Sequence, residues 1–153
     1  MLKNIDFDLT LFRDQSAPER KRSRKALLWL MTGLSKINEG IIRSYGAPPL
    51  YESGVVYKPE RGTEVWRDIP NILADGWGDC EDLACWRIAE LNCAGIKATP
   101  FIKWSFRPDG RIKTYHAVLR VPDGRIEDPS RALGMHGHPM VRRPVYIDEG
   151  PTE

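Results

Sequence analysis

The sequence predicts a mixed α+β fold in which one central helix, with a cysteine at its start, packs on an antiparallel sheet. The helix expected over residues 81–94 has apolar side chains around most of its circumference, which is typical of a helix at the centre of a fold. After it the hydrophobic period becomes strand-like, and turns separate three strands at residues 98–106, 111–121 and 125–128. Both faces of the middle strand are apolar towards its end, which places it inside the sheet.

Length and composition indicate an ordinary globular protein. The chain has 153 residues, of which 41% are hydrophobic and 29% charged, and this suits one domain with its own core. We expect an N-terminal helical region at about 16–44, a core region at about 55–130 and a C-terminal tail at 134–153. The net charge of +2 is too small to indicate a nucleic-acid or membrane partner.

The cysteines and the N-terminus indicate the compartment. Three cysteines are an odd number that does not form a disulfide framework, which favours a reducing environment. No apolar run approaches the length of a membrane span, and the N-terminal residues lack the apolar core of an export signal. We therefore expect a cytoplasmic protein without a membrane partner.

The N-terminal region is expected to contain a strand and then a long helix. Apolar residues alternate over positions 5–11, which predicts an edge strand. Ser16 is the expected N-cap of the helix, and an apolar stripe at helical spacing continues it to about residue 44. Gly33 and Gly40 are the positions where we expect a break.

The long helix begins with a basic run at residues 20–25. This run would be either a patch for nucleic acid or an acidic partner, or the solvated first turns of an amphipathic helix. We favour the second interpretation, because the remainder of the chain has no nucleic-acid-binding motif.

Short elements are expected between the helices and after the central helix. Pro and Gly interrupt the chain before the central helix, leaving an extended piece at 55–57 and a helical turn at 69–73. Turn sequences with Pro, Asp and Gly at 107–110 and 122–124 join the three strands as antiparallel neighbours. The Gly-, Pro- and His-rich tail has room for one last strand within 141–147.

A cysteine lies at the start of the central helix, in Gly76-Trp77-Gly78-Asp79-Cys80. Asp79 is the expected N-cap, and Glu81 and Asp82 lie in the first turn, where the helix dipole favours negative charge. The same dipole favours a thiolate at Cys80, whereas the flanking carboxylates oppose it. A nucleophilic Cys80 therefore needs a cationic partner, and a histidine is the natural candidate.

The strands supply a histidine and an acid. His116 lies in the middle of the second strand among apolar residues, and Asp128 ends the next strand. Cysteine catalysis requires a base that reaches the thiol and a third group that orients the imidazole and stabilises its cation. Each residue alone is more often structural, but a helix tip and two adjacent strands are able to bring all three together. Cys80, His116 and Asp128 are therefore the candidate catalytic triad.

These residues resemble the transglutaminase-like superfamily, which has a papain-like fold. Its members carry a Gly-Asp-Cys-x-Asp helix start, a His on a following strand and an Asp on the strand after that. Residues 78–84, His116 and Asp128 match this pattern, and residues 66–78 are similar to the segment before its cysteine. The resemblance covers about residues 55–130, so it leaves out the N-terminal helix and the tail.

The resemblance implies thiol-dependent acyl transfer to or from a protein or peptide. The superfamily includes proteases, protein cross-linkers, amidases and deglycosylating enzymes. The sequence Asp-Cys-Glu-Asp at residues 79–82 most resembles that of bacterial transglutaminase-like cysteine proteases. Hydrolysis of a peptide or isopeptide bond is thus the first expectation, and protein cross-linking or another amine transfer is the alternative.

The resemblance also implies a candidate metal site. Some of those proteases bind calcium through acids that flank the cysteine, and Asp79, Glu81 and Asp82 match those positions. The alternative is that these acids only stabilise the helix N-terminus. No other cofactor is required by the implied chemistry.

Two further features of the site stay open. The backbone N–H of Cys80 is the expected oxyanion donor, and Trp66, Asn71 or Trp77 would supply the second. A zinc site that joins His136-x-His138 to Cys80 or His116 is disfavoured, because no metal-binding sequence motif accompanies it.

A non-enzymatic alternative has to be kept. The chain would then be an interaction or assembly module, such as a phage-related one, that retains the fold. Its basic helix at 20–25 and its tail would be the working surfaces. The intact triad argues against this alternative, and the thiol pKa distinguishes the two, because a binding module needs no activated cysteine.

Overall fold

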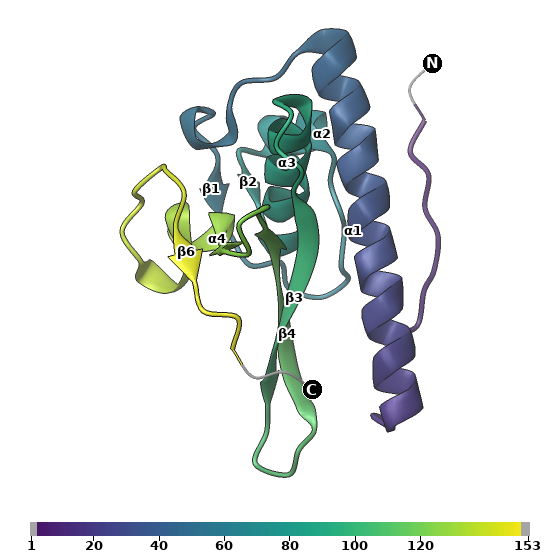
Figure 1. The fold of residues 1–153 in the computed structure, drawn as a ribbon. Coiled ribbons are helices and arrows are strands. Elements are labelled where there is room, and N and C mark those ends of the chain that lie inside the picture. Colours follow the sequence, from purple (N-terminus) through teal and green to yellow (C-terminus); the bar gives the residue numbers. More distant parts are fainter. Residues whose placement is uncertain (1–2, 151–153) are drawn as a thin grey trace.

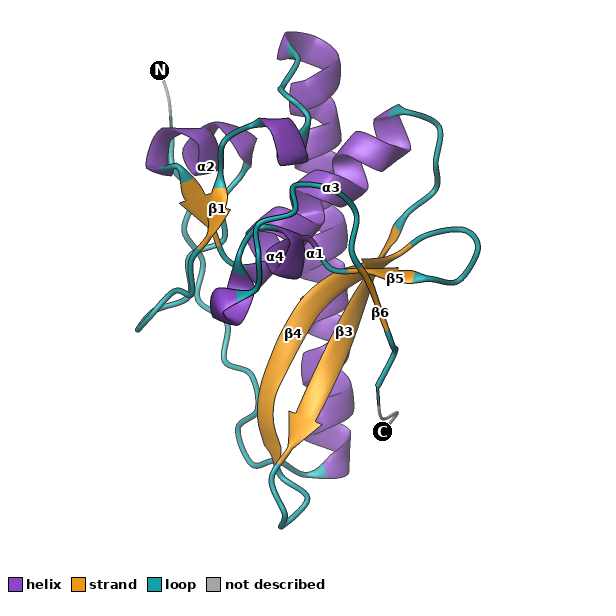
Figure 2. Cartoon of the chain, turned by 90° about the vertical axis from the view of Figure 1, so that its left-hand side faces the viewer, coloured by secondary structure: helices purple, strands orange, loops and turns teal. Residues whose placement is uncertain are grey.

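A computed structural model describes residues 3–150 of the chain. It is a mixed α+β fold in which helices pack on one face of an antiparallel sheet (Figures 1 and 2). The helices are α1 (Ala17–Tyr45), α2 (Ile69–Asp75), α3 (Cys80–Cys93) and α4 (Pro129–Ala132), with 3-10 turns at Leu50–Glu52 and Met135–Gly137. The strands are β1 (Val56–Tyr57), β2 (Trp77–Gly78), β3 (Thr99–Phe106), β4 (Ile112–Arg120), β5 (Ile126–Glu127) and β6 (Tyr146–Ile147).

Helix α1 has the expected bounds but is more regular than expected. Its cap is the predicted one, since the Ser16 side chain accepts a hydrogen bond from the backbone N–H of Glu19 at 3.3 Å. The break expected at Gly33 or Gly40 is wrong, because α1 continues through both. Each glycine costs a helix about 1 kcal/mol, and the buried side of α1, which packs on α3, offsets this cost.

The basic run forms exposed first turns of α1, as the favoured interpretation requires. The Arg22 guanidinium bonds the Glu19 carboxylate at 2.6 Å one turn earlier, and the Lys25 ammonium lies 4.9 Å from the centre of the Trp29 ring. Only Ser23 in this run is fully buried, and its hydroxyl accepts a hydrogen bond from the backbone N–H of Phe12.

The edge strand expected at residues 5–11 is wrong within the described part of the chain. This segment is extended but lies beside α1 rather than beside a strand (Figure 1). Of its alternating side chains, Ile5 and Phe7 remain 87% and 69% exposed, whereas Leu11 packs partly buried against the core. Alternation of apolar residues therefore predicts extended backbone, but it does not predict that a neighbouring strand pairs with it.

The sheet has the order β3-β4-β5-β6, with every neighbouring pair antiparallel. This confirms the three consecutive strands and the internal position of β4. Gly110 and Gly124 close the two predicted turns with φ values of 82° and 91°, which glycine adopts without steric cost. The last strand is shorter than the expected 141–147, because Arg142 has left-handed backbone and Pro144 lacks an N–H donor.

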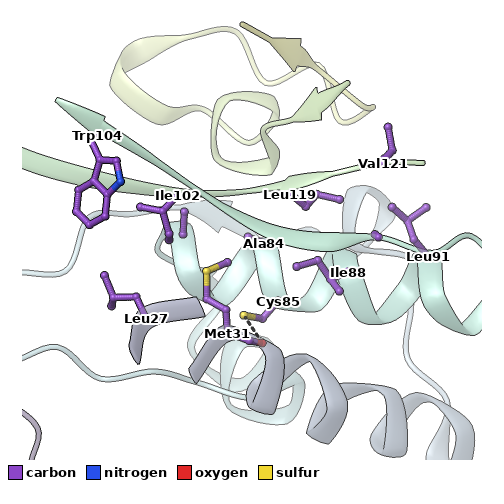
Figure 3. Close-up of a cluster of buried hydrophobic side chains, with 12 residues drawn as sticks. Leu27, Met31, Ala84, Cys85, Ile88, Leu91, Ile102, Trp104, Leu119 and Val121 are labelled. Atoms are coloured by element: carbon purple, nitrogen blue, oxygen red, sulfur yellow. Dashed lines mark hydrogen bonds between the residues drawn. The ribbon is translucent and has the colours of Figure 1, made fainter. Parts of the chain in front are cut away.

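Helix α3 is buried on both sides, as its apolar circumference predicts. On one side Cys85 and Ile88 lie between α1 and the sheet with Met31 and Leu119 (Figure 3). On the other side Leu83 and Trp86 belong to a second cluster, whose other buried members come from the 3-10 turn at 50–52, α2, α4 and nearby loops. Burying one large apolar side chain contributes about 1.5–3 kcal/mol, so the two clusters hold α3 firmly in place.

A buried polar network ties α3 to the end of the sheet. The Glu127 carboxylate on β5 accepts a hydrogen bond from Arg87 Nε on α3 at 2.7 Å. The Tyr51 hydroxyl donates to the same carboxylate oxygen at 2.6 Å. Because Glu127 directly precedes Asp128, this network fixes the position of Asp128 relative to α3.

Candidate active site

The turn before α3 places Cys80 at the first residue of the helix. Asp79 and Asp82 form a reciprocal capping box, in which each side chain accepts a hydrogen bond from the other's backbone N–H. Gly78 allows the close approach, because a Cβ there would lie 3.1 Å from the Asp82 Cβ and 3.2 Å from the Leu83 Cδ2. The local sequence thus positions the thiol as predicted.

The thiol of Cys80 faces an acid and a strand. Its Sγ donates a hydrogen bond to Glu81 Oε2 at 3.0 Å, and the backbone N–H of Ala117 on β4 also lies near it. Burial, followed by the negative charge of Glu81, raises the pKa of the Cys80 thiol well above its ordinary value, and only the Ala117 N–H favours the thiolate. Burial and the Glu81 carboxylate thus oppose the thiolate that a helix N-terminus favours.

The imidazole and the third member of the predicted triad are in direct contact. His116 Nε2 lies 2.8 Å from Asp128 Oδ2. The other oxygen, Asp128 Oδ1, accepts a hydrogen bond from the backbone N–H of Arg131 at 3.1 Å and caps α4. The Asp128 side chain is 2% exposed, so both oxygens are held by fixed partners. Asp128 therefore orients His116 and leaves Nδ1 of the ring for a reacting group.

Cys80 lies next to this pair without a hydrogen bond to it. The sulfur meets β4 at Ala117, the residue that follows His116. In residues 3–150 no hydrogen bond joins the thiol to the imidazole. β5 pairs with β4 only at Leu119 and Arg120, which leaves β4 open beside His116. The thiol therefore has Glu81 and the Ala117 backbone, not the imidazole, as its hydrogen-bonding neighbours.

Acidic residues surround the thiol. Glu81 Oε1 accepts a hydrogen bond from the Tyr115 hydroxyl at 2.9 Å, and Glu81 also interacts with the carboxylates of Glu64 and Asp79. Burial, with the hydrogen bond and charge of Glu81, raises the pKa of Glu64 to about 8. Burial, with the charge of Asp82, raises the pKa of Asp79 to about 7. The cluster therefore holds protons close to neutral pH.

Of the three predicted calcium ligands, only Asp79 belongs to the group of metal-ligating side chains that the structure brings together. Oxygens of Glu60, Glu64 and Asp79 lie within 4.8 Å of one another, and this is the only such group of three or more metal-ligating side chains in the described residues. Asp82 is instead bonded by the backbone N–H of Arg67 at 2.7 Å and by its guanidinium at 3.4 Å. An all-carboxylate set fits a hard cation such as Ca²⁺. Glu81 lies beside this group through its contacts with two of the members.

The histidines of the tail are not part of a metal-ligating group. His136 and His138 lie in the segment after α4, and the only such group in residues 3–150 contains carboxylates alone. His138 Nε2 accepts a hydrogen bond from Arg131 Nε at 3.3 Å. The zinc arrangement weighed from the sequence therefore finds no support.

The candidates for the second oxyanion donor occupy different positions. Asn71 is exposed on α2 and its amide donates to Asp68 Oδ1 at 2.7 Å. Trp77 is covered by the Arg67 guanidinium, 4.3 Å from the ring centre, and Trp66 packs at the border of the core. In the described part of the chain none of the three makes a hydrogen bond to Cys80.

Tyr57 is a residue of the site that the sequence analysis missed. It lies on β1, paired in register with Gly78 of β2, two residues before Cys80. Burial, followed by the charges of Cys80 and Asp79, raises the pKa of the Tyr57 hydroxyl to about 12, and Asp128 acts in the same direction. The sequence contains no signal for this position, because a parallel pair of two-residue strands has no periodicity of its own.

Among the described helices, none has the length and apolar character of a membrane span.

Comparisons with known proteins identify no relative of this chain. Neither the known protein families, nor the curated proteins, nor the solved structures contain a match to this chain.

Proposed function

We propose that this protein is a thiol-dependent acyl-transfer enzyme that hydrolyses a peptide or isopeptide bond through Cys80, His116 and Asp128. The proposal includes the papain-like fold of the transglutaminase-like superfamily, for which the helix packed on an antiparallel sheet is the supporting feature. The observation that carries it is the His116–Asp128 contact of 2.8 Å beside a helix that begins at Cys80. The Asp128 carboxylate, 2% exposed, holds the ring from behind, as the third member of a catalytic triad must.

The proposed reaction has two steps. His116 takes the proton of the Cys80 thiol, the sulfur attacks the carbonyl carbon of the amide, and a carbon–sulfur bond forms. The carbon–nitrogen bond then breaks, and His116 gives its proton to the leaving nitrogen. A water molecule, deprotonated by His116, attacks the thioester carbon and returns the thiol. The backbone N–H of Cys80, at a helix N-terminus, stabilises the oxyanion in both steps.

The same proposal assigns a role to the acids beside the thiol. Glu81 accepts a hydrogen bond from the Cys80 thiol in the resting state, so this bond has to break before His116 takes the thiol proton. We further propose that Glu64 and Asp79, with Glu60, hold Ca²⁺. A bound cation supplies positive charge next to the thiol, which lowers the pKa of a nearby thiol. Glu60 is shared with Arg67, at 3.0 Å, so it is the weakest of the three ligands.

A digest of a mixed peptide library, with and without added Ca²⁺, tests the proposed function. Mass spectrometry of the products should show bond cleavage by the native protein and none by Cys80→Ala or His116→Ala. Half-buried Cys93 provides the control, since Cys93→Ala removes a thiol at the other end of α3. Cleavage that persists in Cys80→Ala would contradict the assignment.

The non-catalytic module remains the second candidate, on one specific observation. The pKa of the Cys80 thiol is raised by burial and by Glu81, which is the opposite of an activated nucleophile. If cation binding does not lower this pKa, the chain binds its partner without chemistry. Protein cross-linking uses the same triad and differs only in that an amine replaces water in the second step.

A further inference from the structure

We propose that the cavity beside His116 binds a carboxylate carried by the amine part of the substrate. This inference rests on the proposed function, and it specifies the substrate class. The favoured substrate is an amide whose leaving amine has an acidic side chain or a free C-terminal carboxylate close to the bond.

The cavity has a volume of about 570 Å³ and opens on the outer face of the sheet. Lys103 and His116 line it from β3 and β4, and Arg131, His136 and His138 line it from the segment that follows Asp128. Such a volume accommodates one or two amino-acid residues. Cys80 does not line this cavity, although His116 and Asp128 do.

The position of the cavity identifies the part of the substrate that enters it. His116 donates its proton to the leaving nitrogen in the proposed reaction, so the substituents of that nitrogen lie on the His116 side. The acyl part stays with the sulfur, which lies against Ala117 and the acidic cluster. The cavity is therefore placed for the amine part and not for the acyl part.

The charges of the lining identify the chemical group. Lys103 lies directly opposite His116 in the β3–β4 ladder, so the two side chains share one face of the sheet. Lys103 Nζ donates to the backbone oxygen of Asp148 at 2.7 Å, and Arg131 Nε donates to His138 Nε2. Within residues 3–150 neither cation forms an ion pair with a carboxylate.

The two acids of the lining, Asp128 and Asp148, do not bond these cations with their carboxylates. Asp128 accepts hydrogen bonds from His116 and from the backbone N–H of Arg131. The contact that Lys103 makes with Asp148 is with its backbone oxygen. The ammonium and the guanidinium thus lack a carboxylate acceptor, and a substrate carboxylate would accept charge-assisted hydrogen bonds from them.

A binding experiment tests the cavity without the need for catalysis. All three histidines of the chain line this cavity, so every imidazole C2–H resonance in the proton spectrum reports on it. Cys80→Ala is titrated with the dipeptides Gly-Glu and Gly-Gln, both as C-terminal amides, so that they differ only in the side-chain charge and neither carries a C-terminal carboxylate. We expect Gly-Glu to shift these resonances with an affinity about tenfold higher than Gly-Gln.

Two variants and a control define the site. Lys103→Met and Arg131→Met should each remove most of the preference for Gly-Glu. Lys113→Met is the matched control, because Lys113 is exposed on the same hairpin and does not line the cavity. Equal affinity for both dipeptides, or a preference that survives in both variants, would overturn the proposal.

A kinetic experiment connects the cavity to the reaction. p-Nitrophenyl acetate transfers its acetyl group to the thiol of Cys80 and releases nitrophenol, and an added amine then attacks the acetyl-thioester. The new carbon–nitrogen bond forms as the carbon–sulfur bond breaks, and His116 passes the amine proton to the sulfur. Because an attacking amine enters where a leaving amine departs, Gly-Glu should increase deacylation about tenfold more than Gly-Gln.

The two experiments separate the inference from the proposed function. Loss of acetylation together with preferred Gly-Glu binding would reject catalysis and retain the carboxylate cavity. Acetylation at Cys80 with equal deacylation by both dipeptides would retain catalysis and reject the cavity as an amine-side carboxylate site.

Discussion

The imidazole half of the candidate site differs from the thiol half in how far it is prepared for catalysis. On the imidazole side His116 is held by Asp128 at 2.8 Å, and both Asp128 oxygens have fixed partners. On the thiol side Cys80 donates a hydrogen bond to Glu81. Burial and the charge of nearby carboxylates raise the pKa of Glu81 as well. One half has satisfied charges, and the other has acids in excess.

This difference indicates where control of the activity lies. A buried group of like charges costs free energy unless protons or a cation neutralise it. In the proposed mechanism the base needs no further change, whereas the nucleophile requires compensation of the charge around Glu81. Regulation of the proposed activity would then lie in the acidic cluster.

The largest effect is expected from removal of the imidazole. His116→Ala should reduce hydrolysis about 10²–10⁴-fold, the usual contribution of general acid–base catalysis. Asp128→Asn should give a comparable reduction, because the ring keeps a neighbour but loses the charge that fixes its tautomer and stabilises its cation. Turnover of a cleaved library peptide measures both. Comparable loss with an unfolded circular-dichroism spectrum would show a structural effect instead.

A large loss of stability is expected from the network that fixes the imidazole half. Arg87→Met leaves the buried Glu127 carboxylate without its cation, which costs about 3–5 kcal/mol of unfolding free energy. Urea unfolding followed by fluorescence measures it. Arg125→Met is the control, because its pair with Asp123 is on the surface and should contribute nothing measurable. Equal stability of both variants would show that the network does not hold β5.

A moderate effect is expected from the acid that faces the thiol. Glu81→Gln removes the charge that opposes the thiolate, so the pKa of Cys80 falls and iodoacetamide alkylation near pH 7 rises about tenfold. Glu149→Gln, in the C-terminal segment, serves as the control. An unchanged rate in Glu81→Gln would mean that burial alone controls the thiol.

A further moderate effect concerns pH and calcium. The pKa values of Glu64 and Asp79 are raised to about 8 and about 7, so the folded protein retains protons that the unfolded chain releases. This stabilisation is complete below about pH 4 and is lost as the pH rises to 8. Because Glu64 is exposed to solvent, we expect a loss on the order of 2 kcal/mol between pH 5 and pH 8.

Added Ca²⁺ should restore this stability at pH 8 and have little effect at pH 5, where the cluster is protonated. Thermal unfolding in chelator and in millimolar Ca²⁺ measures the difference. A Ca²⁺ effect that Glu64→Gln leaves intact would place the ion elsewhere.

Much of the fold was predictable because it depends on local signals. The cap at Ser16, the all-round apolar helix and the two turns ending in Gly110 and Gly124 determine α1, α3 and the order of the strands. The segment at residues 5–11 was misassigned because alternation does not say whether a partner strand exists. The helix of residues 129–132 was not expected, since four residues carry no helical period.

The candidate site was predictable only where the chain presents a motif. Cys80 and Asp79 follow from the helix start, and the His116–Asp128 contact agrees with adjacent strands. Glu60, Glu64 and Tyr57 come from loops and a two-residue strand, whose approach to Cys80 depends on tertiary packing. The raised pKa of the Cys80 thiol was also not predictable from the sequence. Its largest cause is burial, which depends on tertiary packing.

The most direct test of the account is the acetylation of Cys80 by p-nitrophenyl acetate, followed by mass spectrometry of the intact protein. The account predicts one acetyl group per chain, located at Cys80, formed faster with Ca²⁺ and much more slowly in His116→Ala. Acetylation of Cys80 at the same rate in the native protein and in His116→Ala would contradict the triad.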